Sequence, residues 1–336
     1  MSGLSNMLEQ LRGLDLGHAL GLKPPYPRVA LEIEHRGMSL VRLRTRRGGP
    51  PQLDSYRAQE AAESQAPATI FDQGLPAVDG LRDALLRLFE HAGVRPGKVS
   101  LVLPDNLAKI SLLSLPERPP SRRQLEEVIR FKMRRGLPFR VSEAAMTYQF
   151  LPGEGQGVQL LVALIRRALV ERYEQALESV GARPGLVDLC TPNLLNLYRN
   201  RIESAEAGGD VALLNCAATY FTLAIVRQSR LIFFRCKTYA MGQVDRPPVN
   251  GLLARELGYS LSYYEEKLAG AGIQTLFVRA AETPFDELAG QLASLDARHV
   301  ELIDPLTAVA PSGTSALDPA TAQRLAPALG AALGRV

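Results

Sequence analysis

The best candidate for phosphate chemistry in this sequence is a tight turn near residue 35. Alternating apolar residues flank it on both sides, which predicts a β-hairpin over residues 29–43. A turn that wraps a phosphate needs small residues, whose backbone N–H groups approach the anion, and one carboxylate that organises a metal ion. This turn instead carries the bulky residues Glu34, His35 and Arg36, and Glu34 would place a negative charge where the anion binds. The sequence therefore predicts a hairpin that has lost phosphate binding.

No other group of residues predicts an active site. The four histidines are scattered, and none has a cysteine, serine or carboxylate at catalytic spacing. No Walker loop, Gly-x-Ser-x-Gly elbow or His-Glu-x-x-His motif occurs. The cysteines Cys190, Cys216 and Cys236 lack metal-site spacing, which favours reduced thiols packed in the core of a cytoplasmic protein. We therefore expect no catalytic residue and no metal site.

A cluster of basic residues on one predicted helix is the remaining chemical feature. We expect this helix to begin after the N-cap residue Ser121 and to extend to about Arg135. Its basic residues are interspersed with apolar ones and are Arg122, Arg123, Arg130, Lys132, Arg134 and Arg135. Two interpretations fit this pattern equally: the hydrated face of an amphipathic helix, or a surface that binds an acidic partner or lipid headgroups.

Length and composition restrict the class of protein. The 336 residues exceed the usual size of a single core, so two lobes are expected. Hydrophobic residues make up 46% and charged residues 22%, which is ordinary for a soluble globular protein. The sequence has no run of eighteen apolar residues, so we expect no transmembrane helix. The net charge of +4 and the low aromatic content do not indicate binding to nucleic acid.

The order of predicted elements supports two lobes. Strand meanders followed by helices occur twice, once from Val29 and once from Val211, which is the pattern of a duplicated α/β architecture. Before the first meander lies an amphipathic segment that ends at a group of prolines. Its acidic residues offset its basic residues Arg12 and Lys23, so we expect it to pack on its own domain rather than on a membrane.

Six sequence blocks, in order along the chain, carry a resemblance to a known family. They are Lys98–Pro104 with Leu115-Pro116, Leu137–Phe139, Met146–Gln149, Tyr173–Gly181, Glu256–Tyr264 and Ala328–Leu333. Together they resemble the PilM family, the actin-like cytoplasmic proteins of type IV pilus assembly, which are related to the cell-division protein FtsA. The resemblance covers Val29 to Gly334 and implies a two-lobed actin-like (RNase H-like, duplicated) α/β fold with an inserted subdomain of the type called 1C.

The resemblance also implies how the chain is divided. We expect an N-terminal amphipathic segment at 1–27, a first lobe at 28–205 and a second lobe at 206–315. A C-terminal helix at 316–336 is expected to return to the first lobe, and the inserted subdomain to occupy about 97–183. The polar, glycine-rich stretch Glu203–Gly209 predicts the joint between the lobes.

The phosphate-binding turns of the family are altered in this chain. Where the first turn reads Asp-Ile-Gly-Ser-Ser, the chain has Glu32, Ile33, Glu34, His35 and Arg36, and Ser39 stands at the position of the downstream lysine. Where the second turn reads Asp-Ile-Gly-Ala, the chain has Asn215, Cys216, Ala217 and Ala218. Asn215 lacks the charge that would hold a magnesium-bound water, and Ala217 cannot adopt a positive φ as easily as glycine.

The adenosine motif is altered as well, since its Gly-Gly pair is Ala280-Ala281 here. The helix residue Glu256, which could touch a ribose, is retained, and we expect it to be a surface carboxylate. Each lost charge-assisted contact costs about 1.5–3 kcal/mol, so three or four losses remove most nucleotide affinity. We therefore expect no cofactor, neither ATP nor magnesium, and no ATP hydrolysis.

For function, the resemblance implies a scaffold. In the PilM family the partner is the short cytoplasmic tail of the membrane protein PilN, held in a groove beside subdomain 1C. An extended tail would fill pockets with its apolar side chains. Transferred to this chain, the groove walls are Val99, Leu101, Leu103, Leu137, Pro138 and Phe139.

We therefore expect a cytoplasmic protein, peripheral to the inner membrane, that binds a PilN-like tail peptide and other pilus platform or motor components. The alternative is an active actin-like ATP-binding protein of the same machinery.

Overall fold

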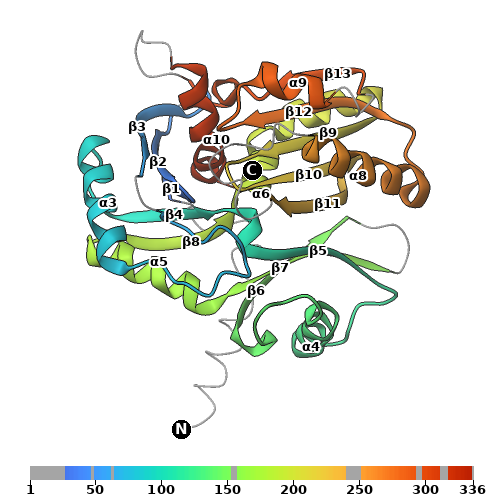
Figure 1. The fold of residues 1–336 in the computed structure, drawn as a ribbon, viewed down its shortest axis with the longest axis horizontal. Coiled ribbons are helices and arrows are strands. Elements are labelled where there is room, and N and C mark those ends of the chain that lie inside the picture. The colour runs from blue at the N-terminus through green and yellow to red at the C-terminus, as the bar shows by residue number, and fades with distance from the viewer. Residues whose placement is uncertain are drawn as a thin grey trace.

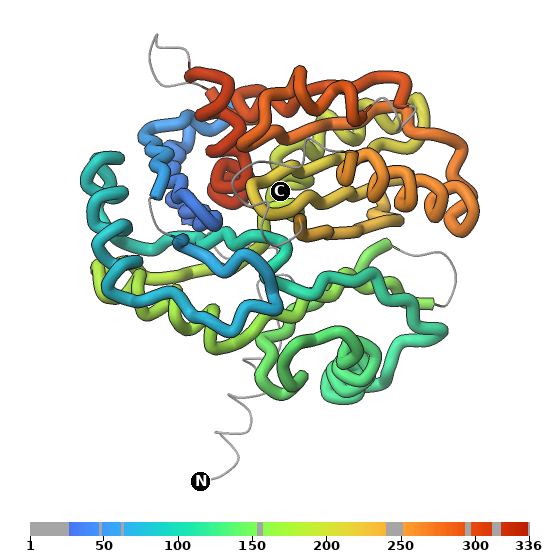
Figure 2. The backbone as a smooth tube through the Cα atoms, in the orientation of Figure 1, coloured from blue at the N-terminus to red at the C-terminus, as the bar shows by residue number. Residues whose placement is uncertain are grey.

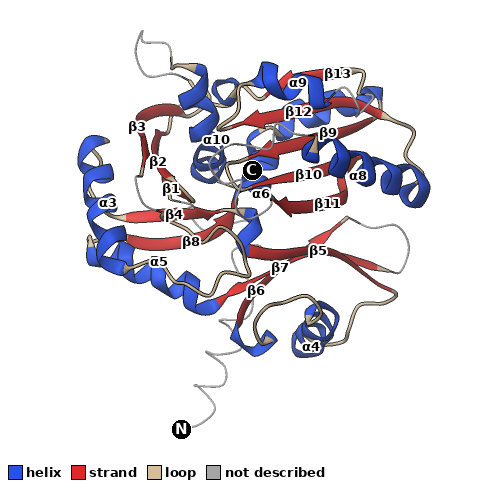
Figure 3. Cartoon of the chain, viewed as in Figure 1, coloured by secondary structure: helices blue, strands red, loops and turns tan. Residues whose placement is uncertain are grey.

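The structure is a computed structural model that describes residues 27–46, 49–61, 64–152, 157–239, 251–292, 297–310 and 317–334. The predicted N-terminal amphipathic segment lies outside the described residues, except for Pro27. Strands form two large sheets and one small sheet, and helices lie on their faces (Figure 1, Figure 3). Among the described residues, no helix combines the length and apolar character that crossing a bilayer requires.

The first lobe contains a five-stranded sheet with the order β3-β2-β1-β4-β8. Its strands are β1 (Val29–Glu34), β2 (Gly37–Arg44), β3 (Gln52–Glu60), β4 (Lys98–Leu103) and β8 (Arg183–Leu189). The predicted hairpin is confirmed, since β1 and β2 pair antiparallel around a two-residue turn, His35-Arg36. The helices α3 (Val78–His91) and α5 (Arg167–Ser179) cover one face, where Leu31 and Ile33 pack against Leu85 and Tyr173.

The second lobe repeats this topology, with the order β11-β10-β9-β12-β13. Its strands are β9 (Asp210–Cys216), β10 (Tyr220–Arg227), β11 (Arg230–Thr238), β12 (Ile273–Ala280) and β13 (His299–Leu302). An antiparallel meander is again followed by two parallel strands. The helices α8 (Leu252–Leu268) and α9 (Phe285–Leu292) pack on one face. The repeated order confirms the predicted two-lobed α/β fold.

Three further helices fill the space between the two large sheets: α6 (Cys190–Leu197), α7 (Arg199–Ala205) and α10 (Pro319–Leu333). They share one apolar core with residues of both sheets, such as Ala30 of β1 and Phe277 of β12. A Cβ atom added at Gly330 would lie 2.0 Å from the Asn193 carbonyl oxygen, so α10 and α6 approach more closely than any side chain there would allow. Figure 2 shows α10 (dark red) beside the first strands of the chain (blue).

The small sheet has the order β5-β7-β6 and lies outside both large sheets. Its strands are β5 (Ala108–Leu115), β6 (Ala144–Leu151) and β7 (Val158–Arg166). The helix α4 (Arg122–Met133) covers one face, and Ser121 caps it as predicted, by accepting a hydrogen bond from the Gln124 N–H. Leu125 and Ile129 of α4 pack against Leu160 and Val162 of β7, so this sheet has a core of its own.

The predicted limits of the inserted subdomain, about 97–183, are too wide for this unit. β4 lies between β1 and β8 in the first sheet, and α5 packs in the core of the first lobe with α3. The separate sheet and its helix span only 108–166. The predicted joint, Glu203–Gly209, begins within α7 and continues as a turn of 3₁₀ helix, η3 (Glu206–Gly208), into β9.

Candidate functional site

One arginine occupies the centre of the cleft between the two lobes. Arg279 lies at the C-terminal end of β12, and only 1% of its surface is exposed. Its Nη1 donates to Glu34 Oε1 at 3.0 Å, and its Nη2 donates to Glu32 Oε1 at 3.2 Å. The same guanidinium donates to Asn215 Oδ1 at 3.1 Å and to the Gln323 carbonyl oxygen at 2.9 Å. It therefore joins β12 of the second lobe to β1 of the first and to α10.

A second buried carboxylate continues this network. Asp105, in the 3₁₀ turn η1 (Asp105–Leu107), accepts hydrogen bonds from the Thr191 N–H at 3.0 Å and from the Thr222 hydroxyl at 2.8 Å. The Thr191 hydroxyl also donates to Asp105 and accepts from Asn215 Nδ2. Because Asn215 contacts Arg279, the polar groups of both lobes form one connected set without any ligand.

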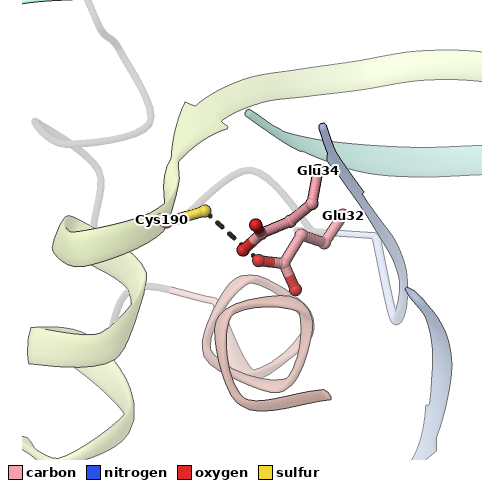
Figure 4. A group of neighbouring side chains, drawn as sticks. All are labelled: Glu32, Glu34 and Cys190. Carbon is pink, nitrogen blue, oxygen red and sulfur yellow. Dashed lines mark hydrogen bonds between the residues drawn. The ribbon is translucent and has the colours of Figure 1, made fainter. Parts of the chain in front are cut away.

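Burial determines the charge of this set. The Glu32 side chain is 1% exposed, and desolvation raises its pKa well above the usual value, although the Arg279 charge opposes the rise. Figure 4 shows the Glu32, Glu34 and Cys190 side chains pointing toward one another, and Cys190 Sγ donates to Glu32 Oε1 at 3.3 Å. Burial also raises the pKa of the Cys190 thiol, so this thiol stays neutral.

These three side chains are a candidate metal site. Their ligand atoms lie within 4.8 Å of one another. However, Arg279 already provides a positive charge at ion-pair distance from both carboxylates, and a metal ion would have to displace this buried guanidinium. The neutral thiol is also a poor ligand. The arrangement therefore favours a protein cation, the guanidinium, over a metal ion.

The predicted positions of the two phosphate turns meet in this cleft. Glu32 and Glu34 lie on β1, and Ser39 pairs opposite Glu32 on β2. Asn215, at the end of β9, is fully buried. Ala217 lies in the turn that follows, where its N–H donates to the Tyr220 carbonyl oxygen at 3.0 Å. The Ala217 N–H is therefore already paired within the protein.

The other predicted nucleotide positions divide into two groups. Ala280 and Ala281 are 7% and 5% exposed at the end of β12, next to Arg279. Glu256 differs from the expectation of a surface carboxylate, since only 17% of its side chain is exposed. Its Oε2 accepts from Arg235 Nη2 at 3.0 Å and lies 3.5 Å from Lys237 Nζ, so it ties α8 to β11.

The open part of the cleft is a small hollow of about 250 Å³, below the usual range of about 300–1,000 Å³ for small-molecule pockets. Its charged lining residues are Glu32, Glu34, Glu60, Glu282, Arg36, Arg279 and Arg324. Arg324 Nη2 lies 2.8 Å from Glu60 and 3.5 Å from Glu282, so it, like Arg279, is bound to protein carboxylates. The hollow therefore does not offer these two cations to a polyphosphate.

Arg279 and Asp105 were not identified from the sequence. The available signal was an arginine at the end of the otherwise mostly apolar strand 273–280, and an aspartate directly after the apolar strand 98–103. Charged residues in such positions are rarely buried unless they are paired. Their partners are not adjacent in sequence, since Glu32 lies 247 positions from Arg279.

The predicted partner-binding residues do not form one groove. Val99 and Leu101 are 1% and 0% exposed in the core of the first lobe, so that prediction is wrong for them as contact residues. β4 is an inner strand whose two faces are both covered. Leu137 and Phe139 pack against the core under α4, and Arg166 lies over the Phe139 ring at 5.3 Å. The adjoining Pro138 is half-buried, and of the six predicted residues only Leu103 lines a hollow described here.

That hollow lies on the face of the small sheet that α4 leaves uncovered. Along β7, Leu161, Ala163 and Ile165 line it, whereas the alternate residues Leu160, Val162 and Leu164 pack under α4. Residues 187–189 of β8 and Pro192 of α6 form the opposite wall. The volume is about 220 Å³, and a second hollow of about 380 Å³ adjoins it. Four residues line both: Gln149, Leu161, Asp188 and Pro192.

The chain is similar to known proteins both in sequence and in structure. The family model "Type IV pilus assembly protein PilM" matches residues 31–246. A solved chain from a "PilM-PilN type IV pilus biogenesis complex" is similar in structure, with a TM-score of 0.72, 20% sequence identity and coverage of 93% of this chain and 98% of that chain. This likeness shows the fold. No curated protein sequence matches.

Two more distant structures have TM-scores of 0.47 and 11% identity. One is a Bacteroides thetaiotaomicron protein with an actin-like ATPase fold, with coverage of 82% of this chain and 90% of that chain. The other is the cytoplasmic domain of EpsL from Vibrio cholerae, an inner membrane component of the type II secretion system, with coverage of 90% and 94%.

The change Arg279→Met tests the role of the buried arginine. It would leave the side chains of Glu32 and Glu34 in the cleft without the guanidinium that donates to both, so we expect the free energy of unfolding, measured with urea, to fall by about 3–5 kcal/mol. The matched control is Arg324→Met, because Arg324 also bridges two glutamates but is 29% exposed. We expect the control to lose less than about 1 kcal/mol. Equal losses in the two variants would contradict the special role of Arg279.

The raised pKa of Glu32 predicts a pH dependence of stability. Above the usual glutamate pKa of 4.5 the unfolded chain releases this proton while the folded protein keeps it, so the contribution of Glu32 to stability decreases as the pH rises toward the folded-state pKa. Compared with Glu32→Gln, the parent protein should lose up to about 1.4 kcal/mol of unfolding free energy per pH unit in this window. Parallel stability curves for the two proteins would show that burial does not shift this pKa.

Proposed function

The chain belongs to the PilM family of type IV pilus assembly proteins, and from this premise we propose that it is a cytoplasmic scaffold of the pilus platform. In this role it binds the short cytoplasmic tail of a PilN-like membrane protein and does not hydrolyse ATP. Other platform or motor components assemble on the same scaffold. The family places the chain in pilus assembly, and the cleft and the apolar hollow support the more specific role.

The observation that carries the absence of hydrolysis is the position of Arg279. A nucleotide-binding cleft has to offer N–H groups and cations to phosphates, and a carboxylate to magnesium. Here the guanidinium lies between Glu32 and Glu34, and Asn215 replaces a carboxylate and bonds to the same guanidinium. A triphosphate would have to break buried ion pairs while meeting unneutralised carboxylates, and either effect costs several kcal/mol.

The hollow beside the small sheet supports binding of an extended peptide. Its floor is apolar, with Leu161, Ala163 and Ile165 in a row, so it can take up apolar side chains of a tail. Its sides are β6 and β8, and each of these is an edge strand of its own sheet. Edge strands have backbone N–H and C=O groups that can pair with an added strand. The hollow thus combines side-chain pockets with main-chain partners.

Titration calorimetry with Mg-ATP tests the first part of the proposal. We expect no heat of binding at millimolar nucleotide, because Arg279 and Arg324 are bound to glutamates. A dissociation constant in the micromolar range, which corresponds to about 8 kcal/mol of binding free energy, would favour the alternative of an active ATP-binding protein.

A labelled peptide with the cytoplasmic tail sequence of the PilN-like protein from the same genome tests the second part. Ala163→Glu would fill the floor of the hollow, so we expect fluorescence anisotropy to report binding at least about tenfold weaker. Phe139→Ala serves as the comparison, because Phe139 packs on the opposite face of the sheet and should leave affinity unchanged. Circular dichroism checks that both variants fold. The reverse result would assign the tail to the turn Leu137-Pro138-Phe139.

A further inference from the structure

The outer face of α4 carries exposed cations that do not line the proposed tail site. We propose that the C-terminal end of α4 and the turn that follows it bind the anionic headgroups of a lipid bilayer. The residues of this surface, here called the α4 basic patch, are Phe131, Lys132, Arg134, Arg135 and Arg140. All five are exposed.

The charges along α4 are not distributed evenly. Near its N-terminus, Arg122 pairs with Glu126 at 2.8 Å and Arg123 with Glu127 at 3.1 Å, so this half of the helix is neutral. Among the described residues, no carboxylate lies within ion-pair distance of Lys132, Arg134, Arg135 or Arg140. Four positive charges therefore meet the solvent within nine positions of the chain, and together they can attract an anionic surface.

An aromatic ring lies within this group of cations. Phe131 is 65% exposed, and the Arg134 guanidinium lies 4.4 Å from its ring centroid. An exposed aromatic side chain among lysines and arginines suits the boundary between lipid headgroups and acyl chains, where the ring enters the apolar layer and the cations meet phosphates. In water alone, exposure of the ring brings no gain.

The shape of the surface favours a bilayer over an acidic peptide. A peptide of this kind binds in a groove or along a sheet edge, but no residue of α4 lines any of the three hollows described above. In Figure 1, α4 lies at the outer end of the small sheet, away from the two large sheets. The flat, charged surface of a bilayer can contact such an outward-facing helix, because this contact does not require a groove.

The patch is also held in a fixed orientation. Leu125, Ile129 and Met133 anchor the opposite face of α4 in the core of the small sheet. Lys109 of β5 donates to the Arg135 carbonyl oxygen, and Arg130 Nη1 donates to the Val141 carbonyl oxygen at 2.9 Å. Because α4 and the apolar hollow lie on opposite faces of the small sheet, lipid contact at the patch leaves the hollow accessible.

Co-sedimentation of the full-length protein with vesicles tests this inference. We expect the protein to bind vesicles of phosphatidylcholine with phosphatidylglycerol, but not vesicles of phosphatidylcholine alone. Binding should weaken strongly at 1 M salt, where charges are screened beyond about 3 Å. The change Arg134→Glu with Arg135→Glu should reduce partitioning at least about tenfold, and Phe131→Ser should reduce it by a smaller factor.

The matched control is Arg82→Glu with Arg87→Glu, which reverses the same number of charges on the exposed face of α3 and should leave partitioning nearly unchanged. If both double variants lost vesicle partitioning equally, net charge alone would explain the binding, and the inference would be overturned. Absence of binding to anionic vesicles would also overturn it. Binding of polyglutamate without binding of vesicles would assign the patch to an acidic protein instead.

Discussion

The ion pair of Arg279 with Glu32 and Glu34 is the interaction on which the arrangement of the two lobes depends. It crosses the cleft, because the guanidinium comes from the C-terminal end of β12 in one lobe and the carboxylates from β1, the first strand of the other lobe. Opening the cleft would separate these buried charges. Buried ion pairs of this kind add little net stability, but removing one partner is costly. In this structure the guanidinium and the two carboxylates connect the lobes directly.

This constraint links the substitutions at the phosphate turns. Glutamate in place of glycine at position 34 would be unfavourable next to a phosphate, but it is favourable next to a guanidinium. Asn215 lacks the charge with which the aspartate of the family turn would hold a magnesium-bound water. It instead forms hydrogen bonds with both Arg279 and Thr191. Together these residues supply from within the protein the cation and the hydrogen bonds that a cleft of this fold could otherwise take from a metal nucleotide. We propose that the scaffold has exchanged a nucleotide-dependent closure for a permanent one.

Much of the fold could be predicted from the sequence because its signals are local. Alternation of apolar residues around the turn at 35 predicted the first hairpin, and Ser121 predicted the start of α4. The failures concern relations between distant elements. Val99 and Leu101 have the pattern of any apolar strand, and only the sheet order shows that other elements cover both faces of β4. The two glutamate partners of Arg279 could not be found for the same reason, since they lie more than 240 positions away.

The small sheet lies outside the cleft between the two lobes. One of its faces packs under α4, and the other lines an apolar hollow against β8 and α6, so the tail site that we propose is separate from the cleft. We propose that Arg279 takes the place of a nucleotide in this cleft. A crystal structure determined with magnesium and a non-hydrolysable ATP analogue at millimolar concentration tests it most directly. We predict an empty cleft with Arg279 between Glu32 and Glu34. Nucleotide density between the two lobes, with the guanidinium moved away from both glutamates, would contradict the account.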